Sequence, residues 1–313
     1  MNTREIIGAN FEIDHKTGYL FVGDVKSERF VVLTKDLLQK AISIMSSRNL
    51  FKLNFGSPFE KMSDLSFLEN FKFLKGLGIG NNNFDITPLS SLDNLEELSI
   101  SFHFNGRIDF SKFPKLKKVH INWENEGVES LLKCEHLLEV SIMNFSGLTL
   151  SDFVNWEDLN SLSLYDPKSI SLEDIGQLKN LLILKINGAK NLKDLGDIEE
   201  LQYLQHFTIH GAKKLEDLTP IMYLKNLKVL NLDTLGSIPS IRFVETLKNL
   251  EEFYMTESTN VEDGDLSVLD HLRKRHMLKK VGFANRKHYS HTREQLGYQV
   301  PPEVAAIFAK KKK

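Results

Sequence analysis

One apolar pattern recurs along most of the chain, and this repetition limits the possible folds more than any other feature. In its clearest copy, apolar residues stand at Leu92, Leu95, Leu98 and Ile100. Ten copies occur, and they begin at Phe71, Leu92, Phe113, Cys134, Trp156, Leu178, Leu201, Leu224, Leu247 and Arg275. Successive copies begin 21 to 23 residues apart, except for a final interval of 28. Such a period indicates a solenoid, because one repeat cannot bury its apolar side chains without a neighbour.

Each copy combines two local periodicities. Its last two apolar residues flank a single residue, as in Leu184-Lys185-Ile186, and this period of two predicts a short strand. The upstream apolar residues are three positions apart, which suits a tight helical or 3₁₀ return. We therefore expect an α/β solenoid, with a curved parallel β-sheet on its concave side and short helical or 3₁₀ returns on its convex side. This arrangement also explains why the chain contains 47 leucines.

The repeats resemble the leucine-rich repeat family over roughly residues 64–286. The most similar type is the short repeat of bacterial internalin-like proteins, because residues 85–89 and 217–221 match its second apolar cluster. The family places an asparagine after each strand, where it satisfies backbone groups of the turn. Only Asn82 matches that position here, so we expect irregular turns.

The predicted organisation has three parts. Residues 1–60 form an N-terminal β-hairpin and helix cap, residues 61–286 the solenoid of about ten repeats, and residues 287–313 a basic C-terminal tail. Caps are expected because a stack of repeats has two open ends. The elements predicted outside the regular repeats are strands at 11–13, 19–22 and 30–33, a helix from Thr34 to about Met45, an imperfect early repeat at 50–55, and a helix near 266–272.

Composition and charge exclude several classes of protein. The formal net charge is −2, which gives no support for nucleic-acid binding. No apolar run approaches the ~18 residues of a membrane span, and the N-terminus lacks the apolar core of a signal peptide. The single cysteine, Cys134, has no intramolecular partner for a disulfide. These features predict a cytoplasmic protein, monomeric when free, with no membrane or nucleic-acid partner and no cofactor.

Three motifs resemble chemical sites, but each has a simpler structural interpretation. Gly76, Gly78 and Gly80 are spaced like a phosphate-binding loop, yet they fall within a repeat strand and are expected to form a smooth outward patch. Cys134 occupies a repeated apolar position, which predicts a buried thiol in the core. Residues 262–265 are acidic, but no calcium-loop pattern follows them, so a turn is expected.

Histidines leave one alternative open. His206 and His210 lie on one predicted strand, and His288 and His291 have a spacing found in metal sites. No compact set of further ligands accompanies either pair, so surface histidines are expected and a metal site is the less favoured alternative. No nucleophile elbow or Ser-His-Asp arrangement is recognisable. The sequence therefore predicts a protein that is not an enzyme.

The outward positions of the predicted strands carry the candidate binding residues. They mix aromatic, aliphatic and charged side chains, which suits a protein interface. An ordinary variable surface is the alternative, because scattered apolar residues on a surface are normal. The candidate partner-binding residues are Tyr165, Ile183, Lys185, His206, His210, Asn231, Asp233, Glu252 and Tyr254.

These observations predict a non-enzymatic intracellular scaffold that binds another protein on its concave face. The resemblance further implies a bacterial immunity protein that neutralises a cognate toxin, since compact proteins of this family include such proteins. The alternative is a regulatory subunit that binds and controls a cellular enzyme such as a phosphatase. A catalytic protein that uses the histidine-rich surface is a third, weaker hypothesis.

Overall fold

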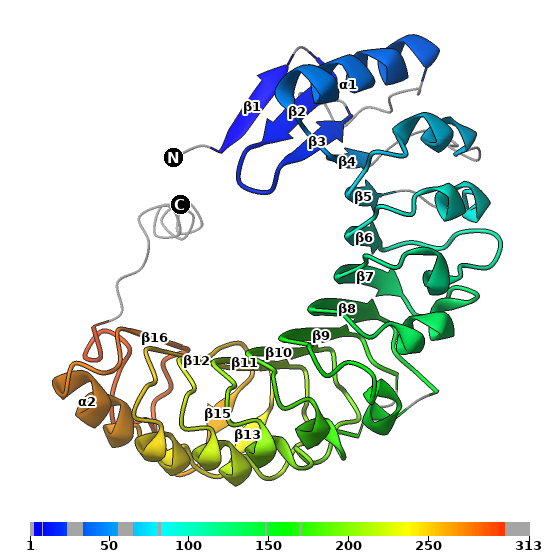
Figure 1. Cartoon of the computed structure of the whole chain (residues 1–313). Coiled ribbons are helices and arrows are strands. Elements are labelled where there is room, and N and C mark those ends of the chain that lie inside the picture. Colours follow the sequence, from blue (N-terminus) through cyan, green and yellow to red (C-terminus); the bar gives the residue numbers. More distant parts are fainter. Residues whose placement is uncertain are drawn as a thin grey trace. The chain divides into compact units, whose positions relative to one another are not determined.

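The computed structural model describes residues 3–7, 9–23, 34–55, 65–80, 83–147, 149–168 and 171–297. The chain divides into two compact units, one comprising residues 1–148 with 152–167 and the other residues 149–151 with 168–313. Within each unit, strands stack on one side and short helical turns lie on the other (Figure 1). The expected solenoid of parallel strands and 3₁₀ returns is confirmed.

The first unit begins with an antiparallel ribbon and a helix. Strands β1 (Arg4–Ile7), β2 (Phe11–Asp14) and β3 (Tyr19–Val22) pair antiparallel. Helix α1 (Lys35–Arg48) begins after Thr34, whose hydroxyl accepts a hydrogen bond from the Leu37 amide at 3.2 Å. The predictions for β2, β3 and α1 are confirmed, whereas β1 was not foreseen. The strand predicted at 30–33 lies outside the described residues.

The same unit continues as a parallel sheet in which each strand joins the next repeat. Its strands are β4 (Lys52–Phe55), β5 (Gly76–Ile79), β6 (Glu97–Ile100), β7 (Lys118–Asn122), β8 (Glu139–Met143) and β9 (Ser161–Tyr165). The returns are η1 (Ser66–Phe71), η2 (Thr87–Ser91), η3 (Phe110–Lys112) and η4 (Val128–Lys133), while η5 (Leu150–Phe153) contains residues of both units. Strand β4 confirms the imperfect early repeat.

The second unit repeats this arrangement. Its parallel strands are β10 (Ile183–Asn187), β11 (His206–His210), β12 (Val229–Asp233), β14 (Glu252–Met255) and β16 (Lys280–Phe283). A small second sheet pairs β13 (Ser237–Ile238) with β15 (Asn260–Val261). The returns are η6 (Ile175–Gln177), η7 (Ile198–Glu200), η8 (Thr219–Tyr223) and η9 (Arg242–Thr246). Helix α2 (Ser267–Lys274) confirms the helix predicted near 266–272.

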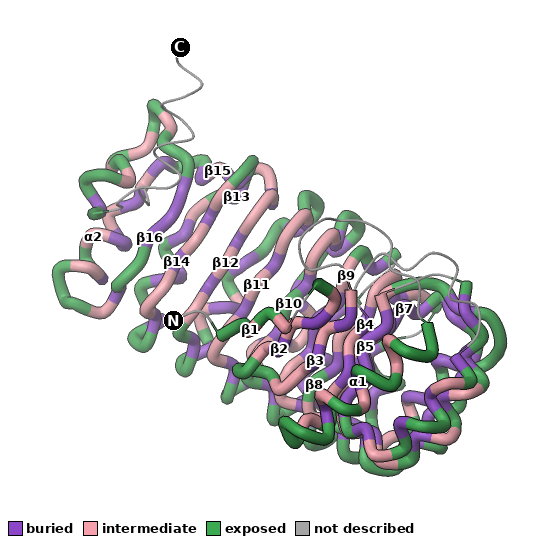
Figure 2. The backbone as a smooth tube through the Cα atoms, turned by 90° about the horizontal axis from the view of Figure 1, so that it is seen from above, coloured by how far each residue is buried: buried purple, intermediate pink, exposed green. Residues whose placement is uncertain are grey.

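The core is a continuous column of the repeated apolar residues within each unit. Along β11, burial alternates strictly, and Phe207 and Ile209 are fully buried between half-buried neighbours (Figure 2). Parallel pairing in register places Phe207 beside Leu184 of the preceding strand and Leu230 of the following one. Side chains at equivalent positions therefore stack on one another, and each repeat completes the core of the next.

The turns after β8 to β12 share one backbone geometry, so the expectation of irregular turns was wrong for these repeats. The turns after β6, β7 and β14 lack this geometry. Several repeats place a residue with positive φ directly after the strand; Asn144, Gly188 and Gly211 are examples. The amide of that residue donates to a carbonyl in the next repeat, as in Gly188 N to His210 O at 2.9 Å and Asn144 N to Tyr165 O at 2.8 Å. A backbone ladder thus replaces the expected asparagine side chains. Asn82 itself lies outside the described residues.

Asparagines do connect the repeats, but from positions before the strand. The side-chain amide of each donates to a backbone carbonyl of the preceding repeat at 2.8 to 3.3 Å. The four residues are Asn94, Asn155, Asn226 and Asn249. The signal in the sequence was the recurring Leu-x-Asn-Leu at 92–95, 224–227 and 247–250, which sequence reasoning did not use.

Thr259 performs a similar role inside the second unit. It is 2% exposed. Its hydroxyl donates to the Leu232 carbonyl at 2.7 Å and accepts from the Leu235 amide at 3.1 Å. Both backbone groups belong to the preceding repeat, so one side chain satisfies two buried polar groups across a repeat boundary.

We predict that Leu184→Asp lowers the free energy of unfolding by more than ~4 kcal/mol, because a carboxylate would replace a fully buried side chain. Urea denaturation followed by circular dichroism measures the change. The adjacent exposed residue supplies a matched control, and Lys185→Asp should cost less than ~1 kcal/mol. Equal effects of the two substitutions would show that the strand register is wrong.

We also predict that Thr259→Val costs ~2–4 kcal/mol, because it leaves the Leu232 carbonyl and the Leu235 amide without their partner. Thr259→Ser keeps the hydroxyl and should retain most of the stability. Thermal melting of the three proteins tests this. A Thr259→Val protein that melts with the wild type would contradict the role assigned to the hydroxyl.

Candidate functional site

The candidate site is built from the outward side chains of neighbouring strands, which we call the concave face of each unit. Alternate residues of a strand point to the same side, so every strand supplies two or three of them. Parallel pairing in register aligns these side chains into rows that cross the strands. The face is therefore fixed by backbone pairing, while its chemistry depends on residues that the core does not constrain.

Much of the first unit's concave face is occupied by contacts among its own side chains. Lys52 Nζ lies 2.8 Å from Glu97, and the Tyr19 hydroxyl donates to the same carboxylate at 3.2 Å. Further along the row, Lys118 and Glu139 form an ion pair of 2.5 Å. The hydrogen bond that Lys118 donates to Glu139 raises the pKa of Lys118. These charges neutralise one another, so they offer little net charge to a ligand.

The glycines of β5 make these contacts possible, and the smooth patch expected there is not found. Gly76 and Gly78 are buried beneath side chains from neighbouring strands. A Cβ atom at Gly76 would lie 2.8 Å from the Tyr19 hydroxyl, and one at Gly78 would lie 2.1 Å from the Asn54 amide nitrogen. The glycines allow Tyr19, Lys52 and Asn54 to lie flat across the sheet. Their role is close packing.

A polar cluster that sequence reasoning missed lies on β7, β8 and β9. His120 Nδ1 is 2.8 Å from the Ser141 hydroxyl, and the His120 ring contacts the Tyr165 ring edge-on at 6.3 Å between centroids. Burial lowers the pKa of His120, which favours the neutral imidazole at neutral pH. No carboxylate bonds to this imidazole within the described residues, so the pair lacks the third group that orients a catalytic base. Tyr165 is thereby fixed against His120 at the edge of this cluster.

The second unit contains eight of the nine predicted binding residues. Backbone register assigns them to three rows. The first row contains Ile183, His206 and Glu252; the second contains Lys185, Asn231 and Tyr254; and the third contains His210 and Asp233. Their strands, β10, β11, β12 and β14, are direct neighbours in the sheet. Tyr165, the ninth residue, belongs to the first unit.

Several of these groups are already satisfied within the second unit. Glu252 pairs with Lys280 at 2.6 Å and accepts from the Tyr254 hydroxyl at 2.9 Å. The Lys280 hydrogen bond is the main cause of the lowered pKa of Glu252. The Tyr254 ring lies against Gly282, where a Cβ would approach it to 2.7 Å. Asp233 accepts from the Thr256 amide at 2.8 Å and also from its hydroxyl.

The remaining predicted residues have no such partners among the described residues. Lys185 is exposed and His206 and His210 are half-buried, and the structure records no hydrogen bond or ion pair for any of the three. Asn231 lies between Thr208 and Tyr254 in its row, and its side-chain oxygen is buried without a hydrogen-bond partner. Lys185, His206 and His210 are therefore available to a ligand, whereas paired groups would first have to break their contacts.

The other candidate sites do not assemble. Cys134 is half-buried rather than fully buried, and it lines a small cavity of about 200 Å³. Burial and the nearby Asp109 raise the pKa of the thiol to about 11, which disfavours a reactive thiolate. Asp263 and Asp265 accept backbone hydrogen bonds in a turn and lie near Arg242, as expected for a structural turn.

The histidines of the C-terminal segment also have structural partners. His288 Nε2 lies 3.0 Å from the Val261 carbonyl, and His291 Nδ1 lies 2.9 Å from the Ser290 hydroxyl. Within the described ranges, no group of three histidine, cysteine or acidic side chains is arranged to hold a metal ion.

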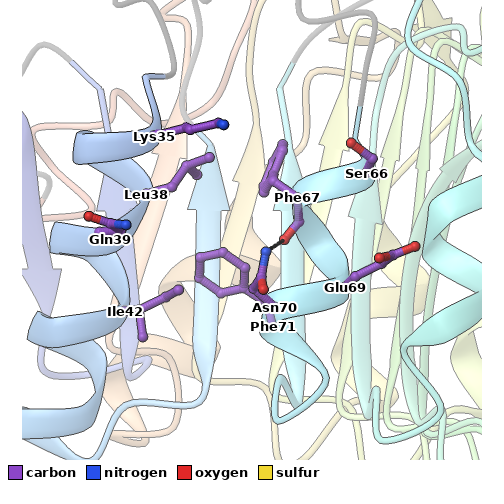
Figure 3. A pocket seen from close by; sticks show the side chains of 9 residues that line it. All are labelled: Lys35, Leu38, Gln39, Ile42, Ser66, Phe67, Glu69, Asn70 and Phe71. Carbon is purple, nitrogen blue, oxygen red and sulfur yellow. Dashed lines mark hydrogen bonds between the residues drawn. The ribbon is translucent and has the colours of Figure 1, made fainter.

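A separate pocket of about 430 Å³ lies between α1 and η1 in the first unit (Figure 3). Leu38 and Ile42 from α1 face Phe67 and Phe71 from η1, and Asn70 donates to the Phe67 carbonyl at 3.3 Å. Its lining contains neither cysteine nor histidine. No helix in the described part of the chain is long and apolar enough to cross a membrane.

Comparison with known proteins identifies the fold. The sequence matches no family model and no curated protein. Among solved structures, internalin F of Listeria monocytogenes superposes with a TM-score of 0.55 at 17% identity, covering 90% of this chain and 84% of the internalin. A chain of the Drosophila Toll–Spatzle complex gives a TM-score of 0.54 at 12% identity, covering 90% of this chain and 47% of that one. The chain therefore has the leucine-rich repeat fold, in the form that internalins share.

Proposed function

We propose that the chain is a non-enzymatic binding protein whose concave face receives another protein. The observation that carries the proposal is the row arrangement of the second unit, in which aliphatic, aromatic and polar side chains from four adjacent strands share one face. Lys185, His206 and His210 lack hydrogen-bond and ion-pair partners within the described residues, which leaves them available to a ligand. Mixed side chains on a rigid sheet suit a protein surface better than a small substrate.

The chemistry of the remaining candidates also favours binding over catalysis. The His120–Ser141 pair has no orienting carboxylate among the described residues, and the raised pKa of Cys134 keeps that thiol protonated at neutral pH. A Drosophila structure of the same fold was solved as the Toll–Spatzle complex. This likeness supports the use of such a fold in binding, although the partner of this chain has to be identified from its own face.

Within this proposal, we assign the partner to the class of toxins, with this chain as the cognate immunity protein. The assignment rests on the resemblance to compact proteins of this fold. Co-expression with the product of a neighbouring gene tests it, because an immunity protein should restore growth that the toxin alone abolishes. Unchanged toxicity would remove this assignment and leave the binding function as it stands.

The binding proposal is tested with the partner recovered from native cells by affinity purification and mass spectrometry. We predict that Tyr254→Ala weakens the affinity of the purified partner by at least ~1–2 kcal/mol, because the half-buried Tyr254 ring is a large rigid aromatic group of the kind that commonly anchors interfaces. Calorimetric titration measures the affinity, and thermal melting checks that the fold is retained.

Tyr203→Ala is the matched control. Tyr203 is 61% exposed but lies in the turn before β11 rather than on the concave face, so its removal should leave the affinity unchanged. If Tyr254→Ala binds like the wild type, or if Tyr203→Ala alone weakens binding, the interface lies elsewhere on the molecule.

A further inference from the structure

We propose that the part of the concave face formed by β10, β11 and β12 binds an acidic segment of the partner protein. This inference rests on the proposed function and adds the chemistry of the partner. It depends on three side chains, Lys185, His206 and His210, which we call the basic patch. Three observations support this inference: the arrangement of the basic patch, the contacts that engage the nearby carboxylates, and the side chains that surround the patch.

Backbone register brings the basic patch together. Lys185 lies directly opposite Thr208, which stands midway between His206 and His210 on the next strand. Alternate residues of a strand are ~6.5–7 Å apart and neighbouring strands ~4.7–4.9 Å apart. The three basic side chains therefore emerge from adjacent positions, with Lys185 central, and one carboxylate-rich segment could contact all of them.

The carboxylates of the same face are already engaged. Glu252 is held by Lys280 at 2.6 Å and by the Tyr254 hydroxyl at 2.9 Å, and Asp233 by the amide and hydroxyl of Thr256. By contrast, the structure shows no ion pair for Lys185, His206 or His210 within the described part of the chain. Lys280 thus neutralises Glu252, whereas Lys185 keeps a positive charge that no ion pair among the described residues neutralises, and a negative group is complementary to it.

The groups that surround each histidine are consistent with this inference. His206 lies between Ile183 of β10 and Val229 of β12 in its row. Lys185 is its diagonal neighbour on β10, and Glu252 follows Val229 in the same row, on β14. His210 faces Asn187 on β10 and Asp233 on β12. The Asp233 carboxylate opposes binding of an acid near His210, but its two hydrogen bonds from Thr256 disperse its charge. The aliphatic neighbours of His206 add apolar contact area.

A protein segment fits this face better than a nucleic acid. The outward positions of β10, β11 and β12 contain no phenylalanine, tyrosine or tryptophan on which a base could stack. Only Lys185 carries a permanent positive charge in the patch, and the chain as a whole has a formal net charge of −2. In a partner segment that mixes acidic and aliphatic residues, the acidic side chains would contact the basic patch and the aliphatic ones would pack against Ile183 and Val229.

The first experiment measures binding of fluorescein-labelled poly-L-glutamate to the full chain by fluorescence anisotropy at low salt. We expect Lys185→Glu to raise the dissociation constant of poly-L-glutamate at least about tenfold. Lys179→Glu is the matched control, because Lys179 is an exposed lysine in the turn before β10, and it should change binding less than about twofold. Circular dichroism melting confirms that both variants are folded.

Acidification supplies an independent readout. Because histidines gain positive charge as the pH falls from about 7.5 to about 6, binding of poly-L-glutamate should tighten over this range. In the double variant His206→Gln, His210→Gln, most of that pH dependence should disappear. A pH dependence that survives unchanged in the double variant would overturn the role of these two histidines.

Three results would overturn the proposal as a whole. The first is that poly-L-glutamate fails to bind the chain. The second is that Lys185→Glu and Lys179→Glu weaken the binding of poly-L-glutamate equally. The third is that an oligothymidylate binds more tightly than poly-L-glutamate and requires Lys185 to do so. The last result would reassign the patch to nucleic acid.

The native partner separates this inference from the function on which it rests. If Tyr254→Ala weakens the partner's affinity and Lys185→Glu does not, the concave-face function stands and the acidic segment is rejected. If both weaken it while Lys179→Glu does not, both conclusions are supported. If neither does, both are rejected.

Discussion

Stacking of apolar side chains between successive repeats is the interaction on which the rest of this structure depends. A single repeat provides one short strand and one 3₁₀ turn, neither of which is stable alone. Parallel pairing in register aligns the buried positions, so that Leu184, Phe207 and Leu230 lie side by side. Each such contact is local in space but crosses a repeat boundary, and the array gains stability only as a column.

The polar groups between the repeats are satisfied in several different ways. Some turns use the amide of a residue with positive φ, such as Gly188 or Asn144. Others use a side chain from the next repeat, such as the amide of Asn249 or the hydroxyl of Thr259. Because a buried carbonyl requires a donor but not a particular residue type, the sequence can vary at these positions while the coil remains regular.

The same tolerance gives the concave face its individual chemistry. Outward strand residues contribute little to the core, so they are free to differ from one repeat to the next. In both units a tyrosine lies across a glycine of a nearby strand and donates to a glutamate that a lysine also contacts: Tyr19 and Glu97 in the first unit, Tyr254 and Glu252 in the second. These contacts engage the hydroxyl and charged groups that a sequence pattern would count as available, while the Tyr254 side chain stays half-buried. The basic patch lies where such contacts are absent.

The sequence by itself determined the repeat period, the strand that ends each copy, and the buried or outward side of each strand residue, because those depend on short spacings that the core enforces. It also indicated α1 through Thr34 and its apolar spacing. It did not reveal β1, the shared turn geometry after β8 to β12, the covering of Gly76, or the contact of His120 with Ser141 and Tyr165. Those depend on partners one or more repeats away and on the direction in which each side chain turns. Only the tertiary structure decided which outward groups bind one another and which remain for a ligand, because Lys52 meets Glu97 across an intervening strand, at a separation that no local pattern encodes.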